Sequence, residues 1–220
     1  MEQLKFLHQQ LLNRPWVGVA ILFAFYFFGT AGIIAGYEEW FIKKTAFNLL
    51  LSFLILILYQ KHPDYKLLIC LGACYIIGFT VEFLGVNYGL IFGDYYYPLT
   101  LGGQLAGVPL IIGINWFIIT FVVWVSIAPI KMPVGIRLIT ATILTVLIDL
   151  LIEPVAMALD FWQWDNDTVP LQNYVGWAVI SFLIFTIYHF LKVSTDNKLA
   201  ISLLALQLIF FVSLNIWLLV

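Results

Sequence analysis

The sequence has very little charge and few of the residues that usually carry metal or redox chemistry. Only 10% of its 220 residues are charged, three are histidine and two are cysteine, whereas 63% are hydrophobic. Because about 25% of the residues in an ordinary globular chain are charged, this chain lacks the polar surface of a water-soluble protein. No tract is basic enough to predict nucleic-acid binding.

Seven apolar stretches predict an integral membrane protein built only of α-helices. A helix needs about 20 apolar residues to cross about 30 Å of hydrocarbon, and these stretches lack the alternation that membrane strands require. The first stretch is longer than the apolar region of a signal peptide, so we expect it to be a helix of the mature protein. We expect residues 1–220 to form a single transmembrane domain. The expected spans, of which the second is the shortest, are residues 16–36, 46–59, 66–84, 105–128, 134–157, 174–191 and 199–220.

Lysine and arginine predict the orientation. Eight of the ten lie before the first span or after the second, fourth and sixth spans, and only Lys43 and Lys44 lie on the other side. Cytoplasmic loops carry an excess of these residues. We therefore expect a multi-pass protein of a bacterial-type plasma membrane, with a cytoplasmic N-terminus and an outer C-terminus.

Three acidic residues lie within the outer parts of spans. The helical rise places Glu82 about 24 Å and Asp149 about 22 Å along their spans, and Glu153 shares a helix face with Asp149. An ionisable residue inside a span is a functional-site hypothesis by default, although both glutamates could instead be hydrated at the interface. Burial and a second carboxylate favour the protonated form, which can act as a general acid at neutral pH.

Two outer loops, residues 85–104 and 160–173, contain no lysine or arginine and are rich in glycine, tyrosine, tryptophan and aspartate. Loops of this length are often functional, although their aromatic residues also suit an interfacial belt. We expect a lid over an apolar cavity. Asn115 and Trp116 follow Pro109, a residue suited to the first turn of a helix, and could face this cavity. A helix–helix hydrogen bond is an equal alternative for Asn115.

The histidines and cysteines do not indicate a metal or redox site. His8, His62 and His189 fall on the cytoplasmic side, away from the acids, and Cys70 and Cys74 are spaced for packing in one helix. Carboxylates alone could bind Mg²⁺, but the outer loops lack the cations that would hold a diphosphate. We expect no metal and no cofactor, which leaves acid catalysis on an apolar substrate, or binding or transport of a neutral one.

Ordered blocks within residues 78–177 carry a resemblance to a known family. They are EFLG from Glu82, FGDYYY from Phe92, GVP from Gly107 with NW at 115–116, DLLIEP from Asp149, DFWQW from Asp160 and PLQNYVGW from Pro170. Together they resemble the membrane carotenoid hydratases of the CruF type, which include bisanhydrobacterioruberin hydratase. The resemblance implies a cofactor-independent hydro-lyase that adds water across the terminal C=C bond of an acyclic carotenoid end group, giving a 1-hydroxy carotenoid.

This reaction requires an acid, a base and aromatic faces. Protonation of C2 leaves a tertiary cation at C1, which water captures. We expect Asp149 or Glu82 to donate the proton and the other, with Glu153, to orient water, while Asp94 is an alternative donor. The expected substrate-binding residues are Asn115, Trp116, Tyr95, Tyr96, Tyr97, Asp160, Trp164, Asn173 and Trp177.

Two other functions remain open on sequence grounds. A membrane carotenoid cyclase would use the same protonation but capture the cation with a second alkene. A carotenoid-binding or transport protein would perform no chemistry, although the two halves of the chain show no convincing repeat of the kind common in transporters. The expected partners are a carotenoid substrate, the lipid bilayer and other enzymes of the carotenoid pathway.

Overall fold

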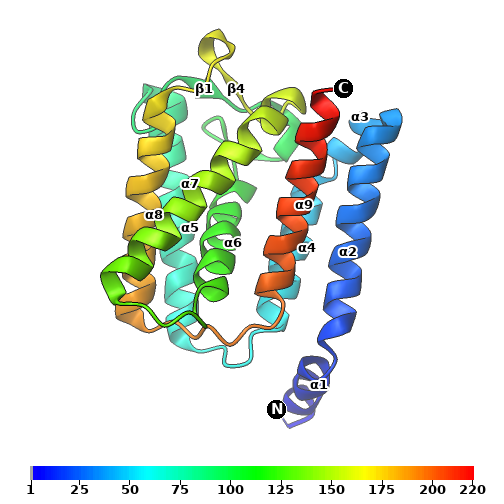
Figure 1. Cartoon of the computed structure of the whole chain (residues 1–220), viewed down its shortest axis with the longest axis vertical. Helices are drawn as coiled ribbons and strands as arrows, with labels where there is room; N and C mark the ends of the chain where they lie inside the picture. Colours follow the sequence, from blue (N-terminus) through cyan, green and yellow to red (C-terminus); the bar gives the residue numbers. More distant parts are fainter. Residues whose placement is uncertain (1) are drawn as a thin grey trace.

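The apolar runs form helices that pack side by side (Figure 1). This computed structural model describes residues 2–220, apart from the side chains of residues 2 and 4–7; Met1, the first residue of the expected domain, lies outside them. The first helices are α1 (Glu2–Leu12), α2 (Pro15–Gly32), the π-helical turn η1 (Ile33–Tyr37), α3 (Glu38–Ile42), α4 (Thr45–Leu58) and α5 (Tyr65–Tyr88). The later helices are α6 (Ile111–Ser126), α7 (Val134–Ala158), α8 (Leu171–Leu191) and α9 (Ala200–Leu218).

Five helical segments are long and apolar enough to cross a membrane, namely 15–42, 65–88, 134–158, 171–191 and 200–218. Two shorter apolar helices, α4 and α6, occupy the other two expected spans. Large apolar side chains such as Phe23, Phe27 and Phe28 of α2 are more than half exposed on the outside of the bundle. Such an apolar exterior suits contact with lipid rather than water, because soluble monomers rarely expose large contiguous apolar patches. The protein is a helical membrane protein.

Helix α6 forms the centre of the bundle. It contacts α4, α5, α7, α8 and α9, and every side chain from Trp116 to Val125 is buried. A helix that is apolar on all sides is expected in the interior of a bundle. Helix α6 is therefore enclosed by the other helices.

The start of α6 differs from the expected span of residues 105–128. Residues 104–109 instead form a small hairpin of β2 (Gln104–Leu105) and β3 (Val108–Pro109). Its turn needs two residues with positive φ, which Ala106 (φ 51°) and Gly107 (φ 79°) provide. Placing Pro109 in the first helical turn was wrong, because this residue lies in β3 and the helix begins at Ile111.

Helices α5, α7 and α8 each extend beyond the expected span. Helix α5 continues to Tyr88, where Gly89 adopts the left-handed conformation (φ 63°) typical of a helix C-terminus. Helix α7 runs through Pro154 to Ala158. Helix α8 begins at Leu171, so Asn173 lies in its first turn and not in the preceding loop.

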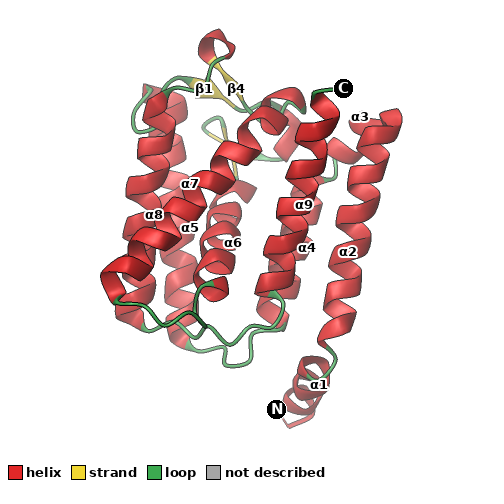
Figure 2. Ribbon diagram, in the orientation of Figure 1, coloured by secondary structure: helices red, strands yellow, loops and turns green. Residues whose placement is uncertain are grey.

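The loops after α5 and α7 meet at one end of the bundle, where they pair as β1 (Tyr95–Tyr96) and β4 (Gln163–Trp164). Figure 2 shows these strands above the helix ends, at the end of the bundle opposite the N-terminus. Tyr95 pairs with Trp164 and Tyr96 with Gln163. We call residues 90–110 and 159–170 the lid.

Candidate active site

The three intramembrane acids are buried under the lid. Glu82 comes from α5, and Asp149 and Glu153 come from adjacent turns of α7. Their exposed fractions are 5%, 1% and 2%. Acidic side chains are almost never this buried unless they are paired. Within residues 2–220, no lysine or arginine forms an ion pair with any of them.

Glu82 is surrounded by hydrogen-bond donors. Its Oε2 accepts bonds from the hydroxyls of Tyr95 (2.6 Å) and Tyr97 (2.7 Å). Its Oε1 accepts a bond from the indole N–H of Trp116 in α6 (2.9 Å). Hydrogen bonds of this kind replace the hydration that a carboxylate loses on burial.

The tyrosines are firm donors because their protons are hard to remove. Burial, followed by the nearby charge of Glu82, raises the pKa of both Tyr95 and Tyr97 well above the ordinary tyrosine value. Both residues belong to the lid segment between α5 and α6. The lid is therefore attached to Glu82 by two hydroxyl groups that stay protonated.

The second carboxyl group is held by tryptophans from the other lid loop. Glu153 Oε2 accepts bonds from the indole N–H groups of Trp162 (2.9 Å) and Trp164 (2.8 Å). Its Oε1 accepts a bond from the Asn173 amide (3.0 Å), which also donates to Asp149 Oδ2 (2.8 Å). One amide group thus bridges Asp149 and Glu153.

Asp149 differs from the two glutamates in the hydrogen bonding of its carboxyl oxygens. Its Oδ1 is buried and has no hydrogen-bond partner in the described structure. A charged carboxylate with an unpaired buried oxygen is very costly. Asp149 is therefore the acid whose surroundings match its neutral, protonated form best.

Two glycines of α5 make room for the site. Gly78 and Gly85 lie one turn before and one turn after Glu82 on the same helix face. A Cβ at Gly78 would lie 2.6 Å from the Trp116 indole, and one at Gly85 would lie 2.6 Å from the Tyr95 hydroxyl. Only glycine at these positions lets both donors approach Glu82.

Aromatic rings form the walls of the site. Trp116 stacks on Trp177 of α8, with ring centroids 4.0 Å apart, and Tyr95 packs on Trp164 at 4.8 Å. The rings border a cavity of about 30 Å³, which is also lined by Glu82, Glu153, Asn115 and Asn173. That volume holds one or two water molecules. We call it the acid cavity.

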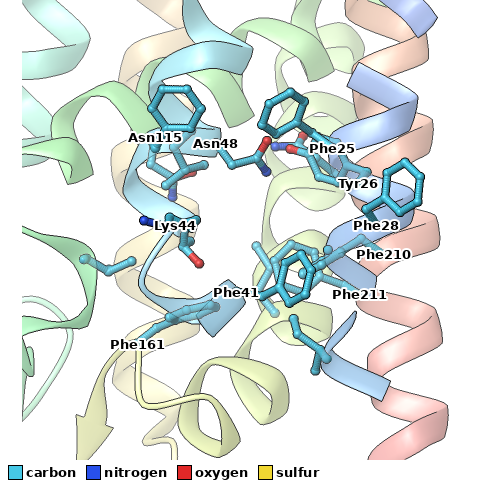
Figure 3. Close-up of a pocket in the computed structure, with 18 of the residues that line it drawn as sticks. Phe25, Tyr26, Phe28, Phe41, Lys44, Asn48, Asn115, Phe161, Phe210 and Phe211 are labelled. Atoms are coloured by element: carbon cyan, nitrogen blue, oxygen red, sulfur yellow. The ribbon is translucent and has the colours of Figure 1, made fainter. Parts of the chain in front are cut away.

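A larger cavity adjoins the acid cavity. It has a volume of about 400 Å³ and is lined mainly by apolar side chains from α2, α3, α4, α6, α7 and α9. Ile112, Asn115 and Trp162 line both cavities. Figure 3 shows Asn115 and Phe161 on one side of this large cavity and Phe28, Phe210 and Phe211 on the other. We call it the apolar cavity.

The structure brings together most of the residues expected at the site. The acid cavity is lined by Glu82, Glu153, Tyr95, Tyr97, Asn115, Trp116, Trp164, Asn173 and Trp177, and Asp149 touches it through Asn173. Asp94, Tyr96 and Asp160 are instead exposed in the lid. The Asp160 carboxylate accepts a bond from Gln163, outside the cavity.

Three site residues, Phe92, Ile112 and Trp162, were absent from the expected set. Trp162 donates to Glu153, and Phe92 lines the acid cavity. Trp162 and Trp164 are two residues apart, a spacing that places both side chains on one side of an extended segment. The alternation within the DFWQW block could therefore have indicated Trp162 as a second site residue beside Trp164.

No group of three or more histidine, cysteine, aspartate or glutamate side chains in the described part of the chain is arranged to hold a metal ion.

A comparison with protein families identifies the family of this chain. A family model described as "Carotenoid biosynthesis protein" matches residues 44–220, which include every residue of the acid cavity. The chain belongs to the carotenoid biosynthesis protein family. The family expected from the sequence blocks is thereby confirmed, and a carotenoid-modifying role is supported for this member.

The chain is similar to a curated protein, bisanhydrobacterioruberin hydratase from Haloarcula japonica. It is 25% identical over 130 residues, which cover 56% of this chain and 44% of the relative. The chain thus spans less than half the length of that protein. No solved structure matches the chain.

Proposed function

We propose that this protein is a carotenoid 1,2-hydratase, which adds water to the terminal C=C bond of an acyclic carotenoid end group. One observation carries the proposal: two buried carboxyl groups line a water-sized cavity that opens beside a large apolar cavity. The apolar cavity suits the hydrocarbon end of a polyene. The acid cavity suits the water molecule that the reaction consumes.

The proton comes from the Asp149–Glu153 pair. The two carboxyl groups share the Asn173 amide, and Asp149 has a bare oxygen that suits a protonated acid. Glu153 lines the acid cavity, so the pair delivers its proton to C2 of the alkene from this residue. A new C–H bond forms, the π bond breaks and C1 becomes a tertiary cation.

Glu82 acts in the second step as the base. Its three donors fit a charged carboxylate, and it lines the same small cavity as Glu153. The water oxygen attacks C1, and the proton that water loses goes to Glu82. This proton then returns to the Asp149–Glu153 pair, so that the protein is regenerated and the net change is addition of water.

The aromatic walls stabilise the cation between the two steps. The faces of electron-rich rings attract positive charge, with tryptophan the most effective. Trp162 is placed best, since it lines both cavities and donates to Glu153. Exclusion of bulk water by the lid limits capture to the water held in the acid cavity.

We further propose that all seven apolar helices cross a bacterial-type plasma membrane, with the N-terminus in the cytoplasm. The two termini lie at opposite ends of the bundle (Figure 1), as an odd number of crossings requires. The distribution of lysine and arginine supports the same orientation. A reporter enzyme that is active only outside the cytoplasm, fused after Val220, should be active; inactivity would contradict this topology.

The product formed in a lycopene-producing host tests the function. Expression of this protein should convert the carotene to a compound heavier by one water molecule, as measured by mass spectrometry. Expression of Glu82→Gln at the same level in the membrane should leave the carotene unchanged. A product of unchanged mass with a new ring would instead indicate the cyclase.

A further inference from the structure

Residues of the lid cover the aqueous side of the acid cavity. Tyr95, Tyr97, Trp162 and Trp164 all come from the lid, and each donates a hydrogen bond to Glu82 or Glu153. The lid loops are also joined to each other by the β1–β4 ladder and by the bond from the Asp165 amide to the Asp94 carbonyl (3.0 Å). Opening the lid for a substrate would break the contacts that hold the catalytic groups in place.

The apolar cavity extends from the lid residues Phe161 and Trp162 to the lipid-facing side of the bundle. Phe25 and Phe28 of α2 and Phe47 of α4 line this cavity. The same side chains are 41%, 63% and 56% exposed on the outside. A side chain that both lines a cavity and lies on the exterior marks a place where the cavity reaches the surface.

Two of these rings bridge neighbouring helices. The Phe25 ring of α2 and the Phe47 ring of α4 have centroids 6.0 Å apart. Phenylalanine side chains change rotamer without breaking hydrogen bonds, so these two rings can move apart at little cost. Displacing the four hydrogen-bonded rings of the lid costs far more.

We propose that the polyene reaches the site laterally from the bilayer, between α2 and α4, past the Phe25–Phe47 pair. This inference rests on the proposed function for the identity of the substrate. The reactive end group passes along the apolar cavity to Asn115 and Trp162, at the boundary with the acid cavity. The rest of the polyene extends into the lipid through this gap between α2 and α4, which we call the portal.

This path defines the substrate class more closely. The protein contacts the acyclic end and the adjoining part of the polyene, while the far end remains in the bilayer. Substrates that share the acyclic end and differ only at the far end, one with a second acyclic end and one with a ring, are therefore expected to react at rates within about threefold of each other.

A reversible cross-link tests the portal. In the double variant Phe25→Cys/Phe47→Cys, a short bis(methanethiosulfonate) joins α2 to α4, and a reducing agent releases them. Native Cys70 and Cys74 are buried. The matched control is Phe23→Cys/Phe27→Cys, an exposed pair on α2 whose rings lie 5.5 Å apart and do not line the cavity.

Each protein is compared with itself before and after reduction, in liposomes that contain the polyene. Cross-linking should slow both hydration and the quenching of tryptophan fluorescence by the polyene at least about tenfold in the portal variant. Reduction should restore both rates, and the control should not respond. Unchanged rates of quenching and turnover in the cross-linked portal variant would contradict entry of the polyene between α2 and α4.

The two readouts separate this inference from the proposed function. If cross-linking blocks quenching but no form of the protein yields a hydrated product, the portal is supported and the hydratase assignment fails. If hydration proceeds equally fast with the portal cross-linked, the hydratase assignment is supported and the lateral path is wrong.

Discussion

The two adjoining cavities have opposite character. The acid cavity is small, its carboxyl groups accept six hydrogen bonds from tyrosine, tryptophan and asparagine, and rigid aromatic rings surround it. The apolar cavity is more than ten times larger and has mainly aliphatic and phenylalanine walls. The difference separates two tasks: one region fixes charge and water, and the other accommodates a flexible hydrocarbon. Substitutions in the first should affect turnover, whereas those in the second should affect substrate binding.

The largest effect is expected from Glu153→Gln. This change removes the acid that faces the cavity but keeps the side-chain volume. General acid catalysis contributes about 100- to 10,000-fold, so kcat measured in liposomes should fall by at least about 100-fold. A kcat within threefold of the parent protein would exclude Glu153 as the proton donor.

The bridge between the two acids is tested by Asn173→Leu. Loss of an amide that donates to two carboxyl groups should cost about 2 kcal/mol, or about 30-fold in kcat. The neighbouring Gln172→Leu is the control, because Gln172 is exposed and its side chain donates a hydrogen bond to the Gly89 carbonyl, away from the acids. Equal activity of the two variants would mean that the bridge has no catalytic role.

The sequence predicted which intramembrane acids lie near each other, but not every residue around them. The constant rise of a helix placed Glu82 and Asp149 at a similar depth along their spans. It did not predict Trp162 as a donor, since that contact depends on how two distant loops pair as β1 and β4. Asp94 and Tyr96 were expected at the site, but they alternate with Tyr95 and Tyr97 and lie on the exposed side of the lid.

An apolar cavity beneath the lid was expected from the sequence, but most of the residues that form its walls could not be predicted. Its lining residues come from six helices, and hydrophobic periodicity does not specify which faces of uniformly apolar helices meet. The length of α6 was overestimated for a similar reason. Residues 105–110 are apolar enough for a helix, yet the positive φ angles at Ala106 and Gly107 turn them into a hairpin.

A smaller effect is expected from Tyr97→Phe. This variant removes one of the three donors to Glu82 while the ring remains. A hydrogen bond to a charged group contributes about 1.5–3 kcal/mol, and partial replacement by Tyr95 should limit the loss to about tenfold in kcat. Retention of full kcat would show that Glu82 does not depend on the lid.

Substitutions in the wall of the apolar cavity should change KM. Ile119→Val removes one methylene from the cavity wall and one polyene contact. Burial of a methylene contributes about 0.8 kcal/mol, so KM should rise by up to about fourfold with kcat unchanged. A fall in kcat with constant KM would contradict the division of tasks between the cavities.

The smallest effect is expected from Asp94→Asn and Asp160→Asn. Both side chains are exposed outside the acid cavity, so each variant should keep kcat/KM within about twofold, as is usual for exposed positions. Either variant losing more than tenfold would return Asp94 or Asp160 to the list of candidate acids.

The most direct test of the central claim is turnover of an acyclic carotenoid by the purified protein in liposomes prepared with heavy-oxygen water and deuterium oxide. The account predicts a product with one heavy oxygen at C1 and one deuterium at C2. Deuterium at C2 without heavy oxygen would show that protonation occurs but that water does not capture the cation. Recovery of the substrate without either label would contradict acid catalysis by this protein.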